Sequence, residues 1–281
     1  MRATRLRRPQ HRPLNRYPAT LGSANIQRVD SSVSPPGLRA TPAPATLLVP
    51  LVALVVLAWL IAADRMAGMD EGAFTDPGTF GFFVSLWVVM MAAMMLPSAA
   101  PMVMVHAAVE RRKRQVGRVA QPGATLAFGA GYLLAWTAYG VLAYALFQLL
   151  RSLDVEPFSS ADGERYLAAG LIAVAAVYQL TPLKNVCLKK CRSPLAFVVG
   201  SWRDGRLGGM RMGVAQGGWC VGCCWAVMGT LFALGLMSLA WMAAIGAMVA
   251  MEKLVPWERA ATFGSAGLLA VLALLVALGV A

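Results

Sequence analysis

The sequence contains little charge. Only 14% of its 281 residues are Asp, Glu, Lys or Arg, whereas soluble domains usually carry about 25%. Hydrophobic residues make up 58% of the chain and lie in long blocks, which is typical of an integral membrane protein. The net charge of +12 does not indicate nucleic-acid binding, because the basic residues lie in the gaps between the apolar blocks.

The sequence also lacks the motifs of several kinds of active site. With two histidines, one of them in the N-terminal segment, it cannot build a His-rich metal or haem site. It has no phosphate-binding Gly-Lys-Ser/Thr loop, no aspartyl phosphorylation loop and no Ser/His/Asp set. We therefore expect a protein that is not an enzyme, with thiol redox chemistry as the exception that the cysteines leave open.

Seven apolar blocks have the length expected of transmembrane helices, since a span needs roughly 20 apolar residues. They cover about 46–63, 80–106, 124–150, 166–183, 212–234, 237–251 and 261–281. The fifth and sixth blocks are nearly continuous, and we place a tight hairpin between them near Gly235. The predicted fold class is therefore all-α, a polytopic bundle of about seven transmembrane helices over residues 46–281.

The segments between the blocks are alternately acidic and basic. The basic segments and the N-terminal segment together hold 22 of the 25 Lys and Arg residues, which places the N-terminus in the cytoplasm. Residues 1–45 hold eight arginines and several prolines, and we expect a disordered basic cytoplasmic tail there. No charged residue falls inside a block, so the predicted interior lacks the carboxylates that carriers of hard cations need.

Sulfur is concentrated inside the apolar blocks. Cys220, Cys223 and Cys224 are spaced i, i+3 and i+4, so they share one face of a helix. At a rise of about 1.5 Å per residue they lie near the centre of the bilayer. Thiols in such a setting suit soft metal ions or thiol redox chemistry. Three glycines predict the close approach of a neighbouring helix: Gly217, Gly218 and Gly222.

Two other groups of sulfur residues extend this pattern. Four methionines lie at an overlapping depth on the second block, just before Pro97 and Pro101, which should bend that helix. A second cysteine pair follows the fourth block beside basic residues that favour the thiolate. The predicted metal ligands are Cys220, Cys223, Cys224, Cys187, Cys191, Met90, Met91, Met94, Met95 and Met228.

Three stretches resemble a bacterial family of unknown function that is described as predicted metal-binding integral membrane proteins and labelled copper-chaperone-like. They are Trp87 to Pro101, Tyr178 to Pro194, and Gly213 to Met228 with Trp241-Met242 and Glu252-Lys253 downstream. The resemblance implies a multi-pass protein of the bacterial inner membrane that handles a metal, copper above others. Where family members often have His-Gly before the first membrane cysteine, this chain has Gln216-Gly217, and Gln is a poor ligand for a soft ion.

Three hypotheses follow. In the first, the chain binds Cu(I) or another soft metal and transports it or transfers it like a chaperone, with Cys187 and Cys191 exchanging the ion at the cytoplasmic side. Its partners would be the lipid bilayer, the metal ion, and a metallochaperone or a periplasmic metal protein, but no nucleic acid. In the second, Cys220-Val221-Gly222-Cys223 is the Cys-X-X-Cys motif of a transmembrane thiol–disulfide relay. In the third, the chain is a non-catalytic membrane assembly partner whose sulfur only packs the core.

Overall fold

The computed structural model describes residues 45–69, 76–117, 120–153 and 161–280, and within them the chain forms helices and turns but no strand. The predicted all-α fold is confirmed for this part. The predicted tail lies outside the described residues, apart from Ala45. The helices are α1 (Ala45–Met66), α2 (Phe80–Gln115), α3 (Ala124–Ser152), α4 (Ala161–Gln179), α5 (Pro182–Cys191), α6 (Pro194–Gly200), α7 (Gly205–Leu234), α8 (Leu239–Leu254) and α9 (Glu258–Ala277).

Six of the seven predicted apolar blocks each fall largely within one helix, whereas the fourth runs past the end of α4 into the start of α5. The hairpin near Gly235 is where the sequence places it. Helix α7 ends at Leu234, Gly235 has a φ of 97°, and α8 begins at Leu239. Residues with a side chain rarely adopt such a positive φ, whereas glycine does so at little cost. A glycine between two apolar blocks therefore marked the point where the chain reverses.

Five helices are long and apolar enough to cross a membrane, namely α1, α2, α3, α7 and α9. Helices α4 and α5 pass the same test as a pair, although the chain bends by 70° between them. Helix α8 has 16 residues, which is fewer than the roughly 20 that a span needs. The length and composition of these helices are those of a membrane protein, with five or six candidate spans in the described residues.

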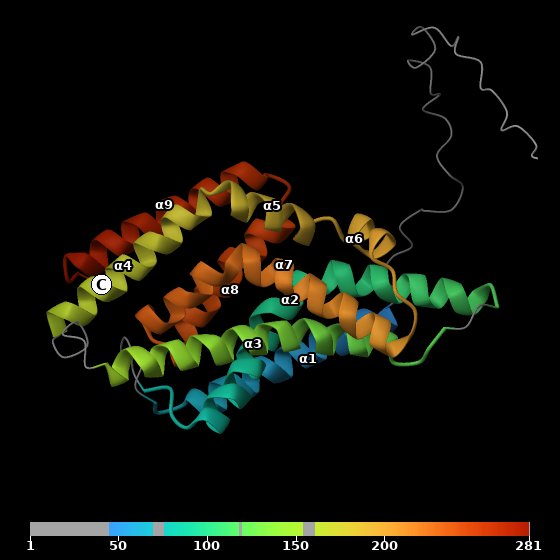
Figure 1. Ribbon diagram of the computed structural model, residues 1–281, viewed down its shortest axis with the longest axis horizontal. Coiled ribbons are helices and arrows are strands. Elements are labelled where there is room, and N and C mark those ends of the chain that lie inside the picture. The colour runs from blue at the N-terminus through green and yellow to red at the C-terminus, as the bar shows by residue number, and fades with distance from the viewer. Residues whose placement is uncertain (1–44, 70–75, 118–119, 154–160, 281) are drawn as a thin grey trace, which may run out of the picture. The chain divides into compact units, whose positions relative to one another are not determined.

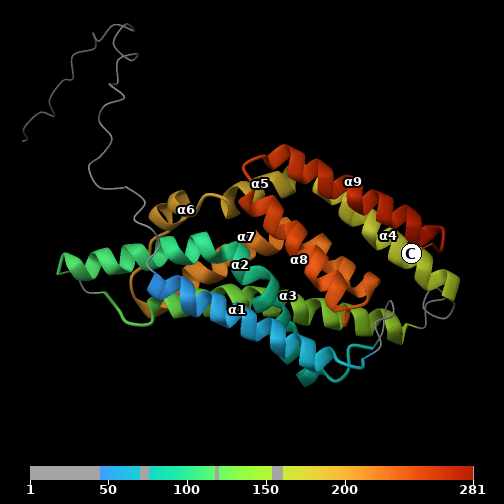
Figure 2. The same cartoon turned by 180° about the vertical axis from the view of Figure 1, so that it is seen from behind.

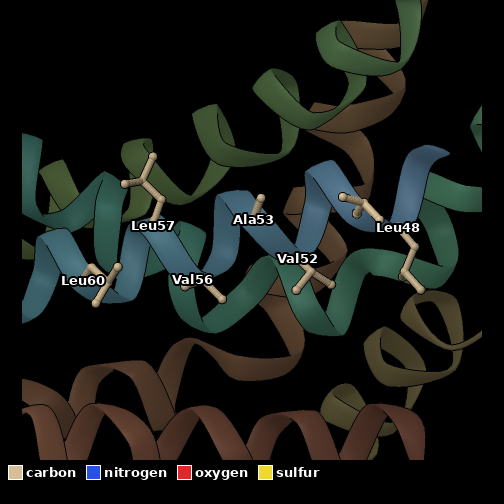
Figure 3. Close-up of a pocket in the computed structure, with 7 residues that line it drawn as sticks. Leu48, Val52, Ala53, Val56, Leu57 and Leu60 are labelled. Carbon is tan, nitrogen blue, oxygen red and sulfur yellow. The ribbon is translucent and has the colours of Figure 1, made fainter. Parts of the chain in front are cut away.

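Helix α1 presents an apolar face that no other helix of the described residues covers. Its exposed side chains include Leu48, Val52, Val56 and Leu60, which recur every four residues and so lie along one side of the helix. Figure 3 shows these side chains together with Ala53 and Leu57 along α1. A long row of exposed aliphatic side chains is what contact with lipid requires.

Helices α3 and α7 pack with their backbones in contact. A Cβ atom built on Gly213 would lie less than 3.0 Å from Phe128 O, and one on Gly217 would lie 2.6 Å from Ala135 Cβ. The predicted close approach of a neighbouring helix is thus confirmed at Gly217. It is also confirmed at Gly222, which contacts the Cys187 side chain of α5. It is wrong for Gly218, which faces open space.

The segment after the fourth block, which the sequence placed in a loop, is largely helical. Thr181 has extended backbone angles and its hydroxyl accepts a hydrogen bond from Lys184 N (3.3 Å), which starts α5 at Pro182. Proline has no N–H to lose at a first helical position, and it disfavours helical angles in the residue before it. The chain therefore turns sharply at this point, and α5 packs against α7.

Figures 1 and 2 show how the remaining helices pair. Helices α4 and α9 lie side by side in both views. Helix α2 runs unbroken through Pro97 and Pro101 but changes direction along its length, as the two prolines predicted. It packs mainly against α1, α3 and α8, while α7 packs mainly against α3, α4 and α5.

Candidate metal centre

Three thiols from two helices form a compact cluster. The Sγ atoms of Cys191 on α5 and of Cys220 and Cys223 on α7 all lie within 4.8 Å of one another. The Sγ atoms of Cys191 and Cys223 are 3.8 Å apart. Thiolates about 2.3 Å from one ion would be separated by roughly 4 Å. The cluster therefore has the dimensions of a metal site, and the fold-back of α5 produces it.

The two other predicted cysteines flank this cluster. Cys224 Sγ lies 3.2 Å from Cys223 Sγ. Cys187, one helical turn before Cys191, is buried against Gly222, where a Cβ would lie 2.9 Å from its sulfur. The sequence placed Cys187 and Cys191 at a separate cytoplasmic site, but the structure brings both cysteine groups together, with Cys191 partly buried and the other four cysteines buried.

A lysine and a tyrosine contact Cys220, and a serine contacts the lysine. The Lys253 ammonium donates hydrogen bonds to Cys220 Sγ (2.8 Å) and to Ser98 Oγ (3.2 Å). The Tyr132 hydroxyl lies 3.0 Å from the same sulfur. All four side chains are buried. Helices α2, α3 and α8 therefore each place one polar group beside the thiols of α7.

The prediction of an interior without charges is wrong. Lys184, Glu252 and Lys253 are all buried. Lys184 Nζ lies 2.6 Å from Glu252 Oε2, and the same carboxylate accepts hydrogen bonds from Gln179 Nε2 (2.9 Å) and from the Ser265 hydroxyl. A buried charge is tolerated when it is paired and hydrogen-bonded. Sequence reasoning had placed the two lysines in loops because they lie at the edges of apolar blocks.

Arg192 fixes the thiol-bearing end of α5. Its guanidinium donates to the backbone carbonyls of Glu252 (2.8 Å) and Val255 (2.6 Å) at the C-terminal end of α8. Those carbonyls have no partner within the helix, so an arginine there satisfies them. The neighbouring Cys191 is thereby held beside α7, and its position depends on α8.

The predicted methionine ligands lie in the same hydrophobic core as the cysteines. Met90, Met91, Met94 and Met95 on α2 and Met228 on α7 are all buried. Met94 packs against Gly246 of α8. Helix α2 contacts the thiols through Ser98 and the bridging Lys253. Metal ligation by these thioethers stays a prediction.

Two other polar residues lie outside the thiol cluster. The His106 ring is stacked between those of Phe128 (5.0 Å) and Trp202 (5.1 Å), and its Nδ1 lies 3.1 Å from Thr125 Oγ1. Gln216, one turn before Cys220, is buried with no hydrogen-bond partner for its Oε1. His106 thus belongs to a helix-packing contact, whereas Gln216 is a polar group beside the cluster.

The donor set is that of a soft-metal site. In the described part of the chain, Cys191, Cys220 and Cys223 are the group of His, Cys, Asp or Glu ligand atoms close enough together to hold one ion. The nearby carboxylate of Glu252 is engaged by Lys184. Thiolates select Cu(I) and Zn²⁺ over Mg²⁺, Ca²⁺ and Mn²⁺.

The fold and this cluster define an all-helical protein, in the described residues, with five or six candidate membrane spans and a candidate metal site made of thiols. A family model described as "PpoB2: Copper chaperone" matches residues 84–276, which is more than half of the chain and includes all five cysteines and Lys253. The chain belongs to this family. No curated protein and no solved structure matches it.

Proposed function

We propose that the protein binds Cu(I) as its cargo at Cys191, Cys220 and Cys223 and passes it to a partner. The observation that carries this proposal is the set of three sulfurs within 4.8 Å, contributed by two helices that are far apart in sequence. Thiolate ligands favour Cu(I) over hard cations. The description of the family as a copper chaperone supports the same metal.

The flanking sulfur residues would provide a path along which the ion leaves the cluster. Cys224 lies 3.2 Å from Cys223, sulfur to sulfur, and Cys187 lies one helical turn from Cys191. An ion that exchanges one thiolate at a time could move along this row without leaving sulfur. Met94, Met95 and Met228 are proposed as weaker thioether ligands on the same path. A metallochaperone or a periplasmic metal protein would supply or receive the ion.

We further propose that the helices cross the bacterial inner membrane several times, with the N-terminus in the cytoplasm. The distribution of Lys and Arg supports this orientation. Helices α4 and α5 would form one broken span. Broken helices at membrane depth usually line substrate or ion sites, and this break delivers Cys191 to the cluster.

Removing the cluster should abolish metal binding. A Cys191→Ser/Cys220→Ser/Cys223→Ser variant, purified in detergent without oxygen, should contain no bound Cu(I) after equilibration, whereas the wild type should retain about one ion per chain. Hydroxyls are poor ligands for soft ions, and serine is close to cysteine in size. Elemental analysis of the dialysed protein measures the ratio.

Two controls make this experiment decisive. Circular dichroism and gel filtration should show that the variant keeps its helices and remains monodisperse. Cys187→Ser, which removes a flanking thiol, should keep most of the bound copper. Equal copper content in the wild type and the triple variant would rule out the proposed site.

A thiol–disulfide relay is the second candidate function, and the sulfur separation between Cys191 and Cys223 favours it. Their 3.8 Å spacing would need to shorten to about 2.05 Å for a disulfide to link α5 to α7. A partner disulfide would accept the two electrons and two protons. In this case Cys191→Ser should trap a mixed disulfide between Cys223 and the partner, visible on a non-reducing gel and absent in Cys191→Ser/Cys223→Ser.

A further inference from the structure

Within the part of the chain that the structure describes, Lys253 lies against the thiol cluster and forms no ion pair with a carboxylate. Lys253 contacts Cys220 Sγ at 2.8 Å and Ser98 Oγ at 3.2 Å, and its side chain is buried. The adjacent carboxylate of Glu252 is held by Lys184 instead. An unpaired buried ammonium is very costly, and the sulfur of Cys220 is a group within reach that can carry the compensating negative charge.

We infer that Lys253 is a specificity-determining residue, whose fixed positive charge matches the thiol cluster to a monovalent metal ion. This inference rests on the proposed function, because it assigns the charge selectivity of the same site. Lys253 contacts a ligand thiol, whereas the neighbouring Glu252 pairs with Lys184.

Counting charges shows why one lysine matters. When two of the three cysteines bind Cu(I) as thiolates and the third stays a neutral thiol, the complex has a charge of minus one, and the Lys253 ammonium makes the assembly neutral. A divalent ion on two thiolates is neutral by itself, so beside Lys253 it reaches neutrality only if the third thiol ionises as well, which requires the loss of one more proton. A neutral assembly is favoured in a buried site because net charge there is poorly solvated.

The charge balance reverses when the lysine is made neutral. In Lys253→Gln every Cu(I) complex with two or three thiolates carries a net negative charge. A divalent ion on two thiolates is then neutral without any lysine. Glutamine is an uncharged amide of similar reach, and it adds no sulfur that could bind Cu(I). The ratio of Cu(I) affinity to divalent-ion affinity should fall.

The experiment compares Cu(I) with Cd(II), a soft divalent ion, in competition titrations of the detergent-purified full chain under anaerobic conditions at one fixed pH. In Lys253→Gln the ratio of the two affinities should fall at least tenfold relative to wild type. Lys253→Leu should give the same fall, which covers the case in which Lys253→Gln does not fold. Lys253→Arg keeps the charge and should keep the ratio within about threefold.

A matched control removes charge at the neighbouring ion pair. Lys184→Met/Glu252→Gln deletes one buried cation and one buried anion together, so the ratio should stay at the wild-type value. An unchanged ratio in both Lys253→Gln and Lys253→Leu would overturn the inference while leaving the thiol site intact. An arginine variant that loses selectivity as the neutral variants do would overturn it too. If the wild type bound no Cu(I), the proposed function itself would fail.

Discussion

Lys184→Met should lower the free energy of unfolding by about 3–5 kcal/mol, because it leaves a buried carboxylate without its cation. Lys184 is fully buried, and its Nζ lies 2.6 Å from Glu252 Oε2. The remaining partners of that carboxylate, Gln179 and Ser265, are neutral donors. Unfolding in mixed detergent micelles, followed by circular dichroism, measures the change.

The same helix supplies a control for this prediction. Lys190→Met alters an exposed lysine two turns further along α5 and should change stability by no more than about 0.5 kcal/mol. Adding Glu252→Gln to Lys184→Met removes the unpaired charge and should restore most of the loss. If Lys184→Met and Lys190→Met behaved alike, the ion pair would not stabilise the fold.

This ion pair also links stability to the metal centre. Lys184 lies near the start of α5 and Cys191 at its end, and Arg192 donates to two carbonyls at the end of α8. Both ends of α5 are therefore bound to α8, close to Lys253, which contacts Cys220. Loosening α5 by Lys184→Met should weaken copper binding as well, since one of the three thiols is on that helix.

The sequence predicted the helices well because apolar length is a strong local signal. Six of the seven apolar blocks each fall largely within one helix, and the glycine between the fifth and sixth blocks ends α7. The cysteine spacing on α7 also predicted correctly that Cys220 and Cys223 share a buried face. These features depend on residues within one or two turns of each other, which is the range over which periodicity is informative.

The partners of the thiols could not be predicted in this way. Lys253 and Lys184 lie at the edges of apolar blocks, where basic residues normally mark cytoplasmic loops. Their burial depends on contacts with Cys220 and with Glu252, which come from other helices. Tyr132 likewise reaches Cys220 from a helix 88 residues away in sequence. Helical periodicity defines a face but not the helix that covers it.

The glycines of α7 illustrate the same limit. The sequence predicted close helix packing at Gly217, Gly218 and Gly222 but not at Gly213, yet Gly213 lies at the crossing with α3 and Gly218 does not. A Cβ on Gly213 would meet the backbone of Phe128 and Tyr132, whereas one on Gly218 would meet nothing within 4 Å. A backbone atom cannot yield by changing rotamer, so these positions should differ sharply in their tolerance of a methyl group.

Gly213→Ala should therefore destabilise the protein by about 1–3 kcal/mol or more through overpacking. Gly218→Ala, five residues along the same helix, should be neutral or stabilising by up to about 1 kcal/mol, because alanine is the better helix former. Gly213→Ala should also weaken copper binding, since pushing α3 from α7 separates the Tyr132 hydroxyl from Cys220. Unfolding curves and the copper content of the two variants test both effects. Equal stability and equal copper content in the two variants would contradict the contact of Gly213 with the α3 backbone, on which the position of Tyr132 depends.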